Sequence, residues 1–266
     1  MTPLNQITSN LTSTIKIFAK SKRQIFLILL LQFAFLAILA WSSIEILPRI
    51  PEAALQMGDV LTQQSQSLQP EDAYKLEEML GQNEQFMQAL QQTVKALLTL
   101  VAIIAASWII LIMPCWYLAH TSVKKTPIKV LFRLFGLGIF WSIVLGVIFV
   151  IYSIASGSTQ TLLPLSSSGM TTTIMIVVLA VVVYVSHVTF AAADQKFKKM
   201  FSICITHAKT TVPAVLINGL LIFVAGSFGV LWWFDNPTVA LVLLICLLFP
   251  VCAFTRMHLI QACQKH

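Results

Sequence analysis

Long apolar runs separated by short polar stretches dominate this chain. Six runs reach about 20 residues, the length an α-helix needs to cross roughly 30 Å of hydrocarbon. They cover residues 25–47, 96–119, 134–155, 172–193, 212–234 and 238–260. Leu, Ile, Val and Phe fill them without the alternating polarity of a membrane β-strand. The pattern therefore predicts an all-α, polytopic membrane protein with six transmembrane helices.

The composition supports a membrane protein. Hydrophobic residues make up 58% of the 266 and charged residues only 10%, against about 25% charged in a typical soluble domain. Soluble enzymes and nucleic-acid-binding proteins are excluded on this ground. The first apolar run is longer than the 7 to 15 residues usual in a cleaved signal peptide, so we expect it to remain as an anchor. We predict a single six-span membrane domain over residues 1–266.

Basic residues predict the orientation, because Lys and Arg beside a span resist translocation. Fourteen of the seventeen precede spans one, three and five or lie near the end of the chain, at or after the end of span six: Lys16, Lys20, Lys22, Arg23, Lys124, Lys125, Lys129, Arg133, Lys196, Lys198, Lys199, Lys209, Arg256 and Lys265. Nine of the ten acidic residues fall on the opposite side, and Asp194 is the exception. Both termini are therefore predicted to be cytoplasmic.

The outer side carries one sizeable segment, residues 48–95. Pro70 followed by two acidic residues is typical of a helix start, and Gly81 of the position after a helix end. A second helix is predicted to begin near Asn83 and to run into span two, giving an outer helical hairpin. The alternative is a Gln-rich loop in which residues 55–69 are unstructured.

Three basic amphipathic segments precede the odd-numbered spans, at residues 14–18 within the cytoplasmic segment 1–24, at 127–132 and at 196–201. We predict that each forms an elbow helix in the membrane interface, in a weak threefold repeat, with its lysines near anionic head groups. In the second, basic residues recur every four positions. The candidates for head-group contact are Lys125, Lys129, Arg133, Lys196 and Lys199.

Three features of the layout recur in a known family: the start of span one at residues 18–31, the Gln-rich outer stretch 61–90 with Gln69-Pro70-Glu71, and the basic stretch from Ala193 to the Pro213-Ala214-Val215-Leu216 opening of span five. In these features the chain resembles the YciC-like inner-membrane proteins of gamma-proteobacteria. Related domains often carry Pro-Gly before span four, which residues 166–170 lack. The resemblance implies a multi-pass protein of the bacterial inner membrane with a part in envelope upkeep, and it supplies no catalytic residues.

Ionisable and polar groups within spans mark functional sites, since they are costly there. Two interpretations of His187, Asp194 and Arg256 stay open: a polar vestibule with Arg133 at its edge, or ordinary residues at helix ends. His187 and Asp194 are seven apart, which places them on one face of a helix. No metal-, nucleotide- or serine-hydrolase motif occurs, so we expect no cofactor and no catalytic residues.

Small residues and prolines predict how the helices pack. Small side chains every four positions let helix backbones approach closely, and they occur at Gly138, Ser142 and Gly146 in span three and at Ala225 and Gly229 in span five. Pro114 and Pro250 remove backbone hydrogen bonds and are expected to kink spans two and six.

The sequence thus favours a non-enzymatic inner-membrane protein that supports cell-envelope integrity through contacts with membrane lipids, anionic lipids among them, or with a membrane-protein partner. The alternative is a small-solute or lipid transporter with a pathway near His187, Asp194 and the kink at Pro250. No nucleic-acid partner is expected.

Overall fold

The computed structural model describes residues 3–67, 80–162, 167–233 and 237–264. These residues form helices and, within the described ranges, no strand. Six helical stretches among them are long and apolar enough to cross a membrane. The chain is therefore an all-α polytopic membrane protein, as predicted.

The helices follow the predicted spans closely. Their bounds are α1 (Pro3–Lys20), α2 (Lys22–Ile46), α3 (Arg49–Ser67), α5 (Glu84–Ser107), α6 (Met113–Val123), α7 (Lys129–Leu162), α8 (Ser167–Ala191), α9 (Phe197–Thr206), α10 (Ala208–Trp233), α11 (Pro237–Leu243) and α12 (Phe249–Gln264). Two compact units are present: unit 1 comprises Met1–Phe33 and Ile109–His266, and unit 2 comprises Ala34–Trp108.

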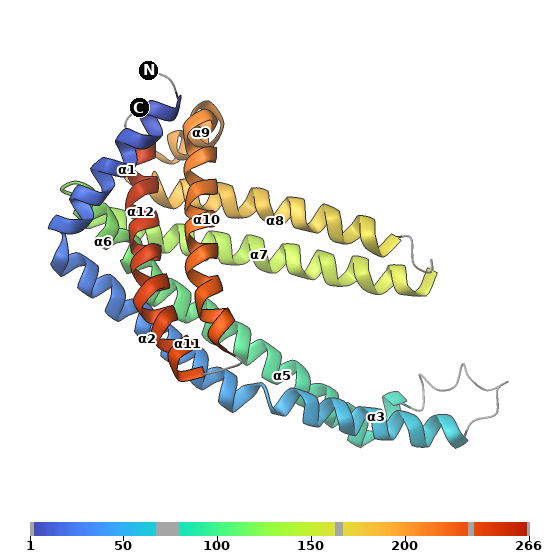
Figure 1. Cartoon of the computed structure of the whole chain (residues 1–266). Helices are drawn as coiled ribbons and strands as arrows, with labels where there is room; N and C mark the ends of the chain where they lie inside the picture. The colour runs from blue at the N-terminus through green and yellow to red at the C-terminus, as the bar shows by residue number, and fades with distance from the viewer. Residues whose placement is uncertain (1–2, 68–79, 163–166, 234–236, 265–266) are drawn as a thin grey trace. The chain divides into compact units, whose positions relative to one another are not determined.

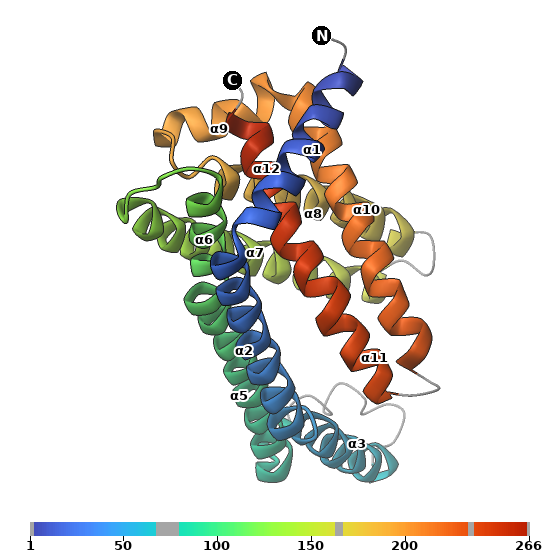
Figure 2. The same ribbon diagram turned by 60° about the vertical axis from the view of Figure 1, so that its left-hand side comes forward.

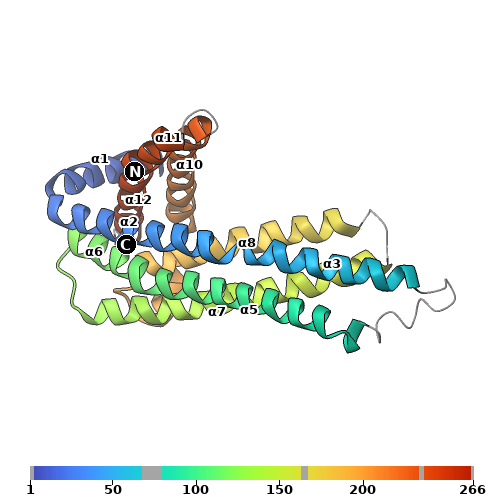
Figure 3. The ribbon, with the colours of Figure 1, turned by 90° about the horizontal axis from the view of Figure 1, so that it is seen from below.

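Unit 1 is built around α12. Helices α1, α6, α8 and α10 pack against it, and Figures 1 and 2 show α1 and α10 beside it. Its side chains Ala253, Met257, Leu259 and Ile260 are almost completely buried. Helices α7 and α8 lie side by side as an antiparallel pair, which is visible in Figure 1 and from below in Figure 3.

A π-helical turn precedes each of the two span prolines. The turn at Trp108–Ile112 ends two residues before Pro114, and the turn at Leu244–Leu248 ends two residues before Pro250. A proline lacks the N–H that an α-helical ladder requires, and a wider turn is one way to accommodate that loss. Each proline is therefore preceded by a departure from α-helical geometry, in the form of a π turn.

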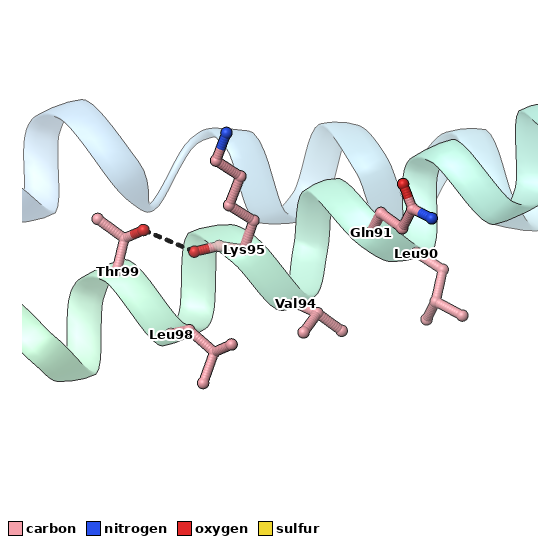
Figure 4. Close-up of a pocket in the computed structure, with 6 residues that line it drawn as sticks. All are labelled: Leu90, Gln91, Val94, Lys95, Leu98 and Thr99. Carbon is pink, nitrogen blue, oxygen red and sulfur yellow. Dashed lines mark hydrogen bonds between the residues drawn. The ribbon is translucent and has the colours of Figure 1, made fainter.

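In unit 2, α3 packs along α5 through small side chains. Ala53 and Val60 of α3 and Ala89 and Ala96 of α5 are buried. Another face of α5 carries Leu90, Val94 and Leu98, which Figure 4 shows lining a shallow pocket. These leucine and valine side chains are exposed within the chain.

The outer segment was predicted correctly at one end only. Asn83 caps α5, since its Oδ1 accepts a hydrogen bond from the Phe86 N–H at 3.0 Å. Gly81 does not follow a helix end, because residues 80–82 are all helical and Asn83 is the break. Residues 55–67 belong to α3, so the unstructured alternative is wrong there. The helix start predicted at Pro70 lies outside the described residues.

Two of the three predicted elbow helices are separate helices, namely α1 and α9. The third is not, because residues 124–128 are non-helical and α7 begins at Lys129 and continues without a break. Nothing after Pro127 interrupts the ladder, whereas α9 ends at Thr206, and the ψ of 18° at its C-cap, His207, departs from helical geometry. Lys125 therefore does not share a helix face with Lys129 and Arg133.

Helix α1 also differs from a helix lying freely in the interface. Thr14 is completely buried and its hydroxyl donates to Gln261 Oε1 of α12 at 2.7 Å. Phe18 makes an edge contact with Phe254, with 5.9 Å between ring centres. One face of α1 thus contacts protein, while Ile15 on another face is 59% exposed.

The small residues of span three allow close helix packing at Gly138 but not at Gly146. A Cβ built on Gly138 would lie 3.0 Å from Met113 Sδ, so α7 and α6 approach closely there. The Ser142 hydroxyl is turned back to the Gly138 carbonyl at 2.8 Å. Gly146 faces open space, so the predicted close packing does not extend to it within the described chain. Ala225 is buried in α10, and the surroundings of Gly229 lie outside the described residues.

Candidate functional site

Buried polar side chains of unit 1 gather along α12 and bind one another. His258 Nδ1–H donates to Asn218 Oδ1 at 2.9 Å, and Asn218 Nδ2 donates to the Thr255 carbonyl at 3.0 Å. Both side chains are buried. Because a polar group left unpaired in a membrane helix is costly, these bonds account for the presence of a buried asparagine and a buried histidine in these helices.

Arg256 directly follows Thr255 of this network and is contacted by side chains from two other spans. In the amide orientation that satisfies both partners, Gln32 accepts from Arg256 Nη1 at 2.7 Å and donates to the Phe249 carbonyl at 3.2 Å. The Arg256 Cζ lies 5.9 Å from the ring centre of Trp116. Spans one, two and six therefore meet at this guanidinium.

His187 joins the same cluster through Trp116. The two rings make an edge contact with 6.1 Å between their centres, and His187 Nδ1–H donates to the Val183 carbonyl at 2.8 Å. Two members of the predicted vestibule, His187 and Arg256, therefore contact one tryptophan. Sequence reasoning missed Trp116, because an aromatic residue in an apolar span carries no polar signal.

Asp194 lies apart from that cluster. Helix α8 ends at Ala191, so the seven-residue spacing from His187 does not place Asp194 on the same helix face. Asp194 instead forms an ion pair with Lys124. Gln195 Nε2 also donates to Asp194 Oδ2 at 3.3 Å. Asp194 is the one acidic residue predicted on the cytoplasmic side, and its charge is thus neutralised by Lys124, which precedes α7.

Basic side chains gather where α7 and α9 begin. Arg133 Nη1 donates to the Gln195 carbonyl at 2.9 Å, which ties α7 to the residue before the α9 N-cap, Lys196. Lys129 lies one turn before Arg133 on α7, and Lys199 lies in the first turn of α9. All four basic side chains are exposed. Four of the five predicted head-group residues therefore lie on these two helix starts, and Lys125 lies in the connection before α7.

A groove of about 280 Å³ adjoins these basic residues. Its lining comes from Arg133, Gly136, Leu137 and Phe140 of α7 and from Phe197 and Met200 of α9. The α7 residues recur at i, i+3, i+4 and i+7, the spacing of a single helix face. Sequence reasoning used Arg133 but missed the apolar members. The spacing of the apolar α7 residues can be read from the sequence. The sequence does not show that α9, about sixty residues further along the chain, lies beside them.

No group of three or more His, Cys, Asp or Glu side chains in the described part of the chain is placed to hold a metal ion. The five cysteines are free thiols. Comparison with protein-family models, curated proteins and solved structures found no match to this chain.

Proposed function

We propose that this integral membrane protein is a non-enzymatic component of the bacterial inner membrane, with both termini in the cytoplasm, and that it supports cell-envelope integrity through anionic lipid or a partner membrane protein. The bacterial inner membrane and the envelope role rest on the resemblance to the YciC-like proteins.

The observation that carries the proposal is the contrast between buried and exposed polar groups. The buried Asn218, His258 and Gln261 are paired within the bundle. Lys129, Arg133, Lys196 and Lys199 are exposed, and none forms an ion pair with an acidic side chain in the described ranges. Exposed cations at the ends of spans attract anionic head groups, each contributing about 1 kcal/mol near the surface.

A deletion strain scored for envelope-stress sensitivity tests the role. We expect the wild-type gene to restore resistance, and a variant with Lys129, Arg133, Lys196 and Lys199 all changed to Gln to restore it only in part. Immunoblotting of membranes and a C-terminal reporter would control for protein level and orientation. Full resistance of the deletion strain would refute the proposal.

A transporter is the second candidate, and the paired π turns favour it. Such turns often occur at functional sites, and the turn before Pro114 lies next to Trp116 of the Arg256 cluster. A pathway there would make Arg256→Gln abolish a solute or lipid flux while protein level stays normal. The matched control is Lys209→Gln, which removes an exposed cation outside the cluster.

A further inference from the structure

The groove between α7 and α9 has an apolar lining and a cation, Arg133, at one end. Leu137 and Met200 are buried at its base, while Phe140 and Phe197 are exposed by 43% and 64%. Phe201 braces both exposed rings, with ring centres 6.5 Å from Phe140 and 5.1 Å from Phe197. Packing against Phe201 therefore holds the Phe140 and Phe197 rings in place on the two sides of the groove, and the groove between them stays open.

Gly136 keeps the groove open. A Cβ built on it would meet no heavy atom within 4 Å. It lies in the middle of the α7 face that lines the groove, one turn from Arg133 and one turn from Phe140. A larger side chain at position 136 would therefore occupy the groove without displacing a neighbouring side chain.

The polar end of the groove is complementary to an anion. Arg133 donates to the Gln195 carbonyl, which leaves other guanidinium N–H groups for a ligand. Gln195 directly precedes the α9 N-cap, Lys196, which gives no side-chain capping bond, and the first turn of α9 carries no acidic residue. A phosphate placed here would accept from the Arg133 guanidinium, and the carbonyl that Arg133 binds lies one residue before the α9 N-cap, Lys196.

We propose that the groove binds one anionic glycerophospholipid, with its phosphate at Arg133 and an acyl chain along Gly136, Phe140 and Phe197. The distance along the helix fits this occupant. Phe140 lies seven residues beyond Arg133, about 10 Å along α7, and Arg133 directly precedes the predicted span 134–155. The head group therefore meets the cation at the membrane surface while the chain enters the apolar layer. This inference rests on the lipid contact in the proposed function and names its site.

Native mass spectrometry of the full-length protein in neutral detergent tests the site with three probes. Dioctanoyl phosphatidylglycerol carries charge and chains, dioctanoyl phosphatidylcholine carries chains without net charge, and glycerol 3-phosphate carries charge alone. We expect the first to bind most tightly. Gly136→Leu should weaken its binding by about tenfold, whereas Gly146→Leu, an equal substitution in open space on α7, should not. Arg133→Gln should weaken it by about tenfold, the factor for one lost hydrogen bond to a charged group, and Lys209→Gln should not.

A second pair of variants tests the site independently if Gly136→Leu lowers the melting temperature. Phe197→Ser removes one wall of the groove, and Ile205→Ser removes a side chain of α9 that is 82% exposed and lies outside it. Weaker phosphatidylglycerol binding only in Phe197→Ser supports the site. Equal phosphatidylglycerol binding by Gly136→Leu and Gly146→Leu, or equal binding of the two lipids by the unaltered protein, would overturn it. The lipid site would stand if the deletion strain had no envelope defect, so the two proposals fail separately.

Discussion

The guanidinium of Arg256 lies over the indole of Trp116, with 5.9 Å between Cζ and the ring centre. The same indole contacts His187, so spans two, four and six share one aromatic side chain. No carboxylate pairs with Arg256 in the part of the chain that the structure describes. The indole face and the Gln32 amide therefore compensate for the loss of hydration around this cation.

Replacing Trp116 should destabilise the bundle. Trp116→Leu removes a ring that is 3% exposed together with its cation contact, and we expect a loss of about 2 to 4 kcal/mol in the free energy of unfolding. Unfolding titrations in detergent would measure it. The control is Trp41→Leu, at a position 58% exposed, where we expect a change within about 0.5 kcal/mol. Similar losses for the two variants would contradict this account.

His187 is expected to be dispensable for function. Its ring packs on Trp116 and bonds to a carbonyl of its own helix, so His187→Gln or His187→Ala should keep normal membrane levels and complement the deletion strain. Loss of complementation at normal levels would instead favour the transporter and place His187 on its pathway.

The close approach of α7 to α6 should make Gly138 intolerant of larger side chains. In Gly138→Leu the new atoms would enter the space of Met113, and overpacking of this kind costs about 1 to 3 kcal/mol. Gly146→Leu on the same helix faces open space and should change stability by less than about 0.5 kcal/mol. Melting temperatures of the two variants would decide, and an equal shift would rule out the close approach.

The ion pair between Lys124 and Asp194 should show measurable coupling. The Asp194 side chain is 9% exposed and that of Lys124 is 39% exposed, so solvent screens the pair in part. A double-mutant cycle with Lys124→Gln and Asp194→Asn should give about 0.5 to 1 kcal/mol of interaction energy. The exposed pair Arg49 and Glu45, at 3.9 Å, should give a value near zero in the same cycle. Equal interaction energies in the two pairs would contradict the expectation that the burial of Asp194 strengthens its ion pair.

Both chain ends should lie on the cytoplasmic side. A cytoplasm-active reporter fused after His266 should be active, and a reporter inserted after Gln66 in the outer segment should not be, because fourteen of the seventeen basic residues are assigned inside. The hydrogen bond between Thr14 and Gln261 brings the first and last helices together, in agreement with this topology. A reporter active only outside at the C-terminus would refute the six-span topology.

Much of the fold could be predicted from the sequence because it depends on local properties. The length of an apolar run decides whether a helix can cross the membrane, and each of the six predicted runs overlaps one helical stretch of that kind. Asn83 caps α5 as expected because capping involves residues three apart. Pro114 and Pro250 each follow a departure from α-helical geometry because a missing N–H is a property of the residue itself.

Contacts between distant segments required the tertiary structure. Asp194 was grouped with His187 by helical spacing, but the helix ends between them and Asp194 pairs with Lys124. The neighbours of Arg256, namely Gln32 and Trp116, come from spans one and two. The groove likewise exists only where α7 meets α9. Hydropathy and capping depend on neighbouring residues, whereas the pairing of side chains depends on which helices pack together, and long-range packing alone decides that.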